Sequence, residues 1–120
     1  MGGSVLIVDD DPAFRRLARV MLVAVSLAVV GEAETAAAAL AAAAALRPDA
    51  VLVDVGLPDR DGVWLAAELT ALPWRPRVVL TSSDPGAATQ RDVERSGAQA
   101  FVPKNALPDA PLGDLLGRPG

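Results

Sequence analysis

Short apolar segments alternate with longer helix-like segments five times along the chain. The apolar segments contain mostly Val, Leu, Ile and Ala, and they are too short for helices. Segments that are apolar on both faces are typical of parallel strands buried between two layers of helices. The alternation therefore predicts an α/β fold with a mostly parallel sheet. The predicted strands are residues 5–8, 27–30, 50–53, 78–80 and 100–102.

The segments between these strands show helical periodicity or helix-favouring composition. Apolar residues recur from Phe14 to Val25 at helical spacing, with three arginines on the opposite face, which predicts an amphipathic helix. Residues 36–45 are alanine apart from Leu40, and alanine has the highest helix propensity. Both segments are therefore predicted helices.

Capping residues and turn residues delimit the remaining predicted helices. The third helix is expected to follow Asp61 and to bury leucines 65, 69 and 72. The fourth is expected to begin with Asp84 as N-cap and Pro85 in its first turn, and to end at Gly97. A last helix after Lys104 is expected from its leucines, although prolines 108 and 111 and glycine 113 interrupt the pattern.

The length of 120 residues fits one domain, which we assign to residues 1–120. Residues 1–3 are expected to form an N-terminal tail, and residues 117–120 a tail or linker. The tail composition is compatible with a stand-alone domain and with a piece of a larger protein.

Composition and charge exclude several classes of function. The chain has no Cys and no His, which excludes disulfides, Cys/His zinc sites and histidine-based catalysis. A net charge of -4 argues against direct binding of nucleic acid. The longest apolar run, residues 20–30, is shorter than the ~20 residues that span a bilayer, and no secretory signal is recognisable. We therefore expect no membrane association and a cytoplasmic location.

Reactive side chains follow four of the five predicted strands. Asp9, Asp10 and Asp11 follow the first strand and Asp54 the third, whereas residues 81–83 (Thr-Ser-Ser) follow the fourth. The fifth is followed by Lys104, which is the single lysine of the chain beside ten arginines. Ligands and reactive groups of open α/β sheets gather at the carboxyl ends of the strands, so we expect these side chains to converge.

Carboxylates held close together repel one another unless a hard cation neutralises them. Mg²⁺ is the expected cation, because it prefers a few carboxylates, a carbonyl and waters, often with a phosphate oxygen. A carboxylate at a strand end is also able to act as the nucleophile of phosphoryl transfer, with a lysine and a hydroxyl stabilising the phosphoryl oxygens. The pattern predicts a magnesium-dependent phosphoryl site.

Four fragments in this order resemble the receiver domain of two-component response regulators, and the resemblance covers nearly the whole chain. The family implies a flavodoxin-like doubly wound fold with strand order 2-1-3-4-5 and helices on both faces of the sheet. It also implies a phosphoacceptor that promotes its own phosphorylation and dephosphorylation, rather than an enzyme with a separate substrate. The fragments are residues 8–12 (VDDDP), 54–62 (DVGLPDRDG), 80–82 (LTS) and 97–104 (GAQAFVPK).

The resemblance implies a role for each matching residue. Asp54 would accept the phosphoryl group from a phosphohistidine, and Thr81 and Lys104 would contact that group. Asp9, Asp10, Asp54 and the backbone carbonyl of Gly56 would bind Mg²⁺. Phe101 matches the switch aromatic of the family. The positions that shape the approach of the hydrolytic water in the family are occupied here by Gly56 and Ser83. The implied partners are a sensor histidine kinase or phosphotransfer protein and an output domain or effector.

Other interpretations of the same residues stay open at this point. Asp11 before Pro12 is suited to cap the first helix rather than to bind metal, and Phe101 is as well explained by the core as by a switch. Asn105 stands where many family members have a proline in a cis peptide, which leaves the loop after Lys104 undefined. Two other functions fit less of the pattern: a receiver-like scaffold that is not phosphorylated, and a phosphatase of the haloacid-dehalogenase kind, whose nucleophile would instead follow the first strand.

Overall fold

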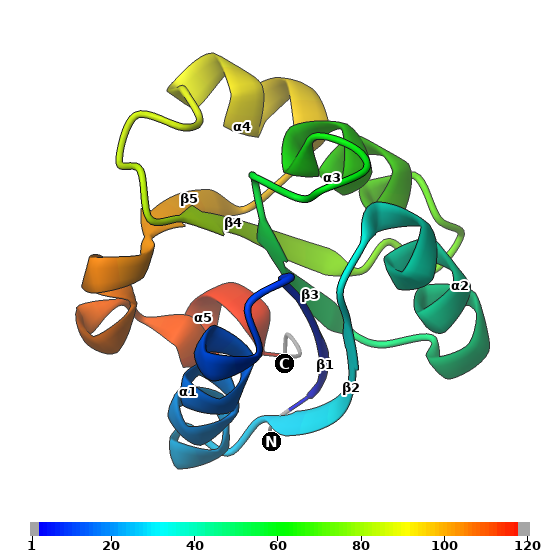
Figure 1. The fold of residues 1–120 in the computed structure, drawn as a ribbon. Coiled ribbons are helices and arrows are strands. Elements are labelled where there is room, and N and C mark those ends of the chain that lie inside the picture. The colour runs from blue at the N-terminus through cyan, green and yellow to red at the C-terminus, as the bar shows by residue number, and fades with distance from the viewer. Residues whose placement is uncertain (1–2, 118–120) are drawn as a thin grey trace.

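The computed structural model describes residues 3–117. Five strands within this range form a single parallel sheet in the order β2-β1-β3-β4-β5 (Figure 1). The predicted α/β class and strand order are thus confirmed. Parallel pairing in register brings the carboxyl ends of the strands to one edge, with Asp54 opposite Thr81. The strands are β1 (Ser4–Val8), β2 (Ala28–Ala33), β3 (Ala50–Asp54), β4 (Arg77–Ser82) and β5 (Ala100–Pro103).

Helices cover both faces of the sheet, with α1 and α5 on one face and α2, α3 and α4 on the other (Figure 1). Alternate strand residues enter the two cores: Leu6 and Val8 pack with α2 and α3, whereas Val5 and Ile7 pack with α1 and α5. This two-sided burial explains the continuous apolar runs of the central strands. The helices are α1 (Pro12–Ala24), α2 (Ala36–Leu46), α3 (Gly62–Thr70), α4 (Gln90–Ser96) and α5 (Leu112–Leu116).

The first helix begins where the sequence predicts. Asp11 is the N-cap, its side chain accepts a hydrogen bond from the amide of Ala13, and Pro12 occupies the first turn. The connection to β2 is short, and Ser26 takes a left-handed conformation there with φ of 67°. The strand that follows runs to Ala33, beyond the predicted end at residue 30, because its carboxyl half pairs with β1 up to Val8.

The start of α4 differs from the prediction. Asp84 caps no helix; its side chain accepts a hydrogen bond from Gly86 in a turn. The helix begins at Gln90 with Thr89 as N-cap, and Thr89 and Asp92 form a reciprocal capping box. The two hydrogen bonds of the capping box favour a helix that starts after Thr89, whereas the side chain of Asp84 accepts only the one from Gly86. The predicted end is confirmed, since Gly97 is the C-cap with φ of 78°.

The segment after Lys104 is divided by its prolines. A 3-10 helix, η1 (Lys104–Asp109), precedes the short α5, and the described residues contain no cis peptide bond. Of the predicted tails, residues 1–2 and 118–120 lie outside the described part. Gly3 is buried, and its carbonyl accepts a hydrogen bond from the amide of Ala28. Within residues 3–117, no helix is long and apolar enough to cross a membrane.

Candidate metal centre

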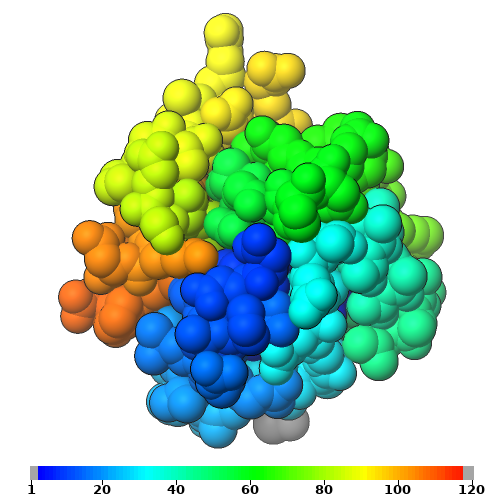
Figure 2. Space-filling model, viewed as in Figure 1, coloured from blue at the N-terminus to red at the C-terminus, as the bar shows by residue number. Residues whose placement is uncertain are grey.

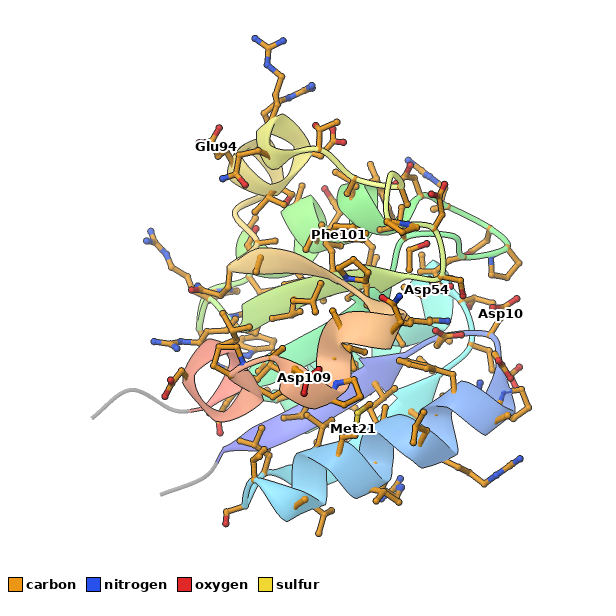
Figure 3. The ribbon with its side chains drawn as sticks, turned by 90° about the vertical axis from the view of Figure 1, so that its left-hand side faces the viewer. Asp10, Met21, Asp54, Glu94, Phe101 and Asp109 are labelled. Atoms are coloured by element: carbon orange, nitrogen blue, oxygen red, sulfur yellow. The ribbon has the colours of Figure 1, made fainter. Side chains whose placement is uncertain are left out.

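Three carboxylates meet at the carboxyl edge of the sheet. Asp9 and Asp10 follow β1, and Asp54 ends the neighbouring β3. One carboxylate oxygen from each residue lies within 4.8 Å of the others. Asp9 and Asp54 are buried, with 1% and 7% of their surface exposed, whereas Asp10 is exposed. Figure 3 shows Asp10 and Asp54 at the same end of the sheet.

The backbone around Asp54 is fixed by its neighbours. The amide of Val55 donates to the carbonyl of Thr81 at 2.9 Å, and the amide of Gly62 donates to the carbonyl of Val55 at 2.8 Å. A Cβ atom on Gly62 would lie 2.6 Å from the Cα of Val55, so glycine is needed where α3 begins. Gly56 faces open space, since an added Cβ would meet nothing nearer than Asp54 Oδ2 at 4.0 Å.

Asp9 is held by one hydrogen bond and one ion pair. Its Oδ1 accepts a hydrogen bond from the amide of Asp11 at 2.8 Å. Its buried Oδ2 lies 2.8 Å from Nζ of Lys104 and accepts no hydrogen bond from the described residues. The same Nζ lies 4.2 Å from the centre of the Phe14 ring, which adds a cation–π contact. Lys104 therefore converges with the acids, as the sequence predicts.

The electrostatics of the group favour a bound cation. Burial raises the pKa of Asp54, and the carboxylates of Asp9 and Asp10 raise it further, against the opposing effects of Lys104 and the Gly56 amide. Two buried carboxylates, one of them with an oxygen that accepts no hydrogen bond from residues 3–117, are suited to a hard divalent ion. The exposed Asp10 leaves room for the waters that Mg²⁺ retains. The residues present thus fit Mg²⁺.

The other predicted residues lie around this group with different orientations. Thr81 is fully buried beside Asp54, and its hydroxyl donates to the carbonyl of Val102 at 2.7 Å. Phe101 lies on β5, half-buried against the core on the face of the sheet that α2, α3 and α4 cover, and Ser83 is exposed after β4. The structure therefore groups the carboxylates of Asp9, Asp10 and Asp54 and pairs Lys104 with Asp9, whereas the Thr81 hydroxyl donates to β5.

Two residues at the site were not predicted as part of it. Phe14 was predicted only as a core residue of the first helix. Arg15 is one of the three arginines that the periodicity places opposite the apolar face of the first helix, yet its side chain is only 11% exposed. Its Nη1 donates to the carbonyl of Asp9 at 2.6 Å, and its Nε bonds Glu32 at 2.8 Å. Helical periodicity gives the face of Arg15 but not its partner, because Glu32 comes from another element.

The segments that follow the strands meet on one face of the molecule. Figure 2 shows the blue segment after β1 bordered by the green segment after β3, the cyan end of β2 and the orange segment after β5. A doubly wound sheet with an acidic group, a buried threonine and a lysine at this edge has the side chains that suit a magnesium site.

Comparison with known proteins agrees with that class. Residues 5–111 match the family model of the response regulator receiver domain. The chain therefore belongs to the receiver domains of two-component response regulators. Mg²⁺ binding at an acidic aspartate cluster is a property of this family, and the Asp9, Asp10 and Asp54 group matches it. The assignment gives no support to the phosphatase alternative.

Individual relatives resemble this chain over most of its length. The transcription regulator BvgA of Bordetella pertussis is 33% identical over 88% of this chain and 50% of its own length. A protein-glutamate methylesterase/protein-glutamine glutaminase of Anaeromyxobacter dehalogenans is 39% identical over 89% of this chain and 32% of its own. The receiver domain of NarL from Mycobacterium tuberculosis superposes with a TM-score of 0.79 at 32% identity, covering 98% of both chains.

The chain spans about half the length of BvgA and about a third of the methylesterase. Each relative is thus much longer than the part of it that this chain matches. Receiver domains interact with histidine kinases and with effectors or output domains.

Proposed function

We propose that this domain is a phosphoacceptor whose Asp54 receives a phosphoryl group in a Mg²⁺-dependent reaction. The observation that carries the proposal is the grouping of a buried Asp54 with Asp9 and Asp10, beside a lysine paired to Asp9. A scaffold without phosphorylation would have no need for two buried carboxylates in mutual repulsion.

The donor would be the phosphohistidine of a sensor histidine kinase or phosphotransfer protein in the cytoplasm. An oxygen of Asp54 attacks phosphorus, the bond from phosphorus to the imidazole nitrogen breaks, and its electron pair stays on the nitrogen, which takes up a proton. Hydrolysis reverses the modification: water attacks phosphorus, the bond to the Asp54 oxygen breaks, and the carboxylate and inorganic phosphate are released.

Mg²⁺ would be held by Asp9, Asp10, Asp54 and the carbonyl of Gly56. When bound, it would neutralise negative charge on the phosphoryl oxygens. Lys104 would contribute a second positive charge from its position beside Asp9. The chain has no histidine, and none is needed, because the nucleophile is a carboxylate.

Thr81 would transmit the modification to the partner surface. Its hydroxyl donates to the carbonyl of Val102, next to Phe101 on β5. A phosphoryl group on Asp54 would offer the hydroxyl a charged acceptor, which forms a stronger hydrogen bond than a carbonyl. Loss of the bond to Val102 would free β5 to shift, and Phe101 would rotate inward. Affinity for an output domain or effector would change with that movement.

The test is intact-mass analysis after incubation with Mg²⁺ and acetyl phosphate. We expect the wild type to gain one phosphoryl group and the Asp54→Asn variant to gain none. Asp84→Asn, in the turn before α4, is the matched control and should be labelled like the wild type. No labelling of the wild type would favour the scaffold, and labelling that survives Asp54→Asn would place the acceptor elsewhere.

A further inference from the structure

Asp59 joins the loop after β3 to the beginning of a different helix. Its Oδ1 accepts a hydrogen bond from the amide of Ala36 at 2.8 Å, and its Oδ2 accepts one from the amide of Ala37 at 3.0 Å. These amides belong to the first turn of α2, more than 20 residues earlier in the chain. The loop after β3 is therefore attached to α2 by both carboxylate oxygens.

The attachment completes the capping of α2. The first amides of a helix lack partners within it. Thr35, the N-cap, accepts from the amide of Ala38, and Asp59 accepts from the two amides before that. No acidic residue lies in the first turn of α2, so Asp59 supplies negative charge at the positive end of the helix dipole. These hydrogen bonds lower the pKa of Asp59, which keeps it an ionised acceptor.

The attached loop is the one that carries Gly56. On one side the loop is fixed by Leu57, whose side chain is 9% exposed and packs in the core. At its ends it is fixed by the backbone bonds of Val55 and Gly62. Asp59 is exposed, so burial of its own side chain does not account for its position. Its bonds to α2 fix the part of the loop that the core does not reach.

We infer that Asp59 is a positioning residue for the metal site. By holding the loop on α2, it sets the place of the Gly56 carbonyl relative to Asp54. Partners that orient metal ligands in this way influence affinity although they never touch the metal. The inference rests on the proposed function, in which Gly56 is a ligand of Mg²⁺.

The test compares Asp59→Ala with Thr35→Ala, which removes the other cap of the same helix and leaves the loop attached. Both variants lose capping hydrogen bonds, so both should melt at lower temperature. In EDTA, hydrogen exchange of the backbone amides of residues 55–61 should be faster in Asp59→Ala only. Titration with Mg²⁺ should show affinity weakened roughly tenfold in Asp59→Ala and near the wild-type value in Thr35→Ala. Asp59→Asn keeps one acceptor oxygen and should fall between Asp59→Ala and the wild type.

Wild-type exchange and wild-type Mg²⁺ affinity in Asp59→Ala would overturn the inference and leave the proposed function intact. Equal losses in Asp59→Ala and Thr35→Ala would also overturn it, because the effect would then come from the stability of α2. A wild type that binds no Mg²⁺ would overturn both the proposed function and this inference.

Discussion

The ammonium nitrogen of Lys104 lies 2.8 Å from Oδ2 of Asp9. Because this oxygen is buried and accepts no hydrogen bond from the described residues, the ion pair is its main polar contact. The lysine that is expected to contact the phosphoryl group is thus paired with a predicted metal ligand. Mg²⁺ at Asp9 would compete for that carboxylate and would leave the ammonium available to the phosphoryl group.

Replacing Lys104 by Arg should separate labelling from response. Arginine keeps the charge, but its planar guanidinium does not reproduce a compact ammonium between Asp9 and the Phe14 ring. We expect Asp54 to be labelled by acetyl phosphate while the amide chemical-shift changes of residues 93–101 are lost. Identical shift changes in the variant and the wild type would show that Lys104 does not couple the two events.

Replacing Asp10 by Asn should weaken Mg²⁺ binding roughly tenfold or more, because a charged ligand is lost. Asp11→Asn is the matched control. Asp11 caps α1, and asparagine caps helices about as well as aspartate, so its Mg²⁺ affinity should stay near that of the wild type. Calorimetric titration with Mg²⁺ measures both. Equal affinities in Asp10→Asn and the wild type would remove Asp10 from the metal site.

Asp54 should make the metal-free protein less stable as the pH rises. Its pKa in the folded state is raised above the ordinary value of 3.8, so the folded protein binds this proton more tightly than the unfolded chain. Stability is therefore lost as the pH rises from 3.8 through the raised pKa. Asp54→Asn lacks this penalty, and in EDTA its advantage in Tm should be smallest at low pH and grow until the pH has passed the raised pKa of Asp54.

Melting curves between acidic and neutral pH measure this difference, and it should shrink when Mg²⁺ is added to the wild type. The other carboxyl groups with shifted pKa values are the same in both proteins and cancel in the comparison. A Tm difference that does not vary with pH would show that Asp54 ionises normally in the folded state.

The lifetime of the phosphorylated state should depend on Gly56 and Ser83. Neither is suited to orient the hydrolytic water or to block it. Space for a side chain exists at Gly56, and Ser83 is exposed, so Gly56→Asn combined with Ser83→Glu is compatible with the fold. We expect the double variant to lose phosphate about tenfold faster. Phosphate release is followed in Mg²⁺ after the donor is removed; equal rates would show that contacts outside this chain set the lifetime.

The elements of this fold follow from local features of the sequence. The apolar segments predicted all five strands, and Asp11 and Gly97 correctly marked the start of α1 and the end of α4. These features act within a few residues, through capping bonds and the burial of apolar side chains. Where two local signals competed, as at Asp84 and Thr89, the sequence alone led to the wrong start for α4.

The chemistry of the site was also predictable, because residue type and position after a strand suffice to group Asp9, Asp54 and Lys104 at one edge. The contacts that these residues make with one another and with their neighbours were not predictable from the sequence. Three of these contacts join segments from different elements: the pairing of Lys104 with Asp9, the hydrogen bond from Arg15 to the Asp9 carbonyl, and the attachment of Asp59 to α2. Which atoms meet is decided by strand register and helix packing, and these depend on the whole core at once. The sequence by itself therefore determined the elements and the kinds of reactive group, and only the tertiary structure decided their partners.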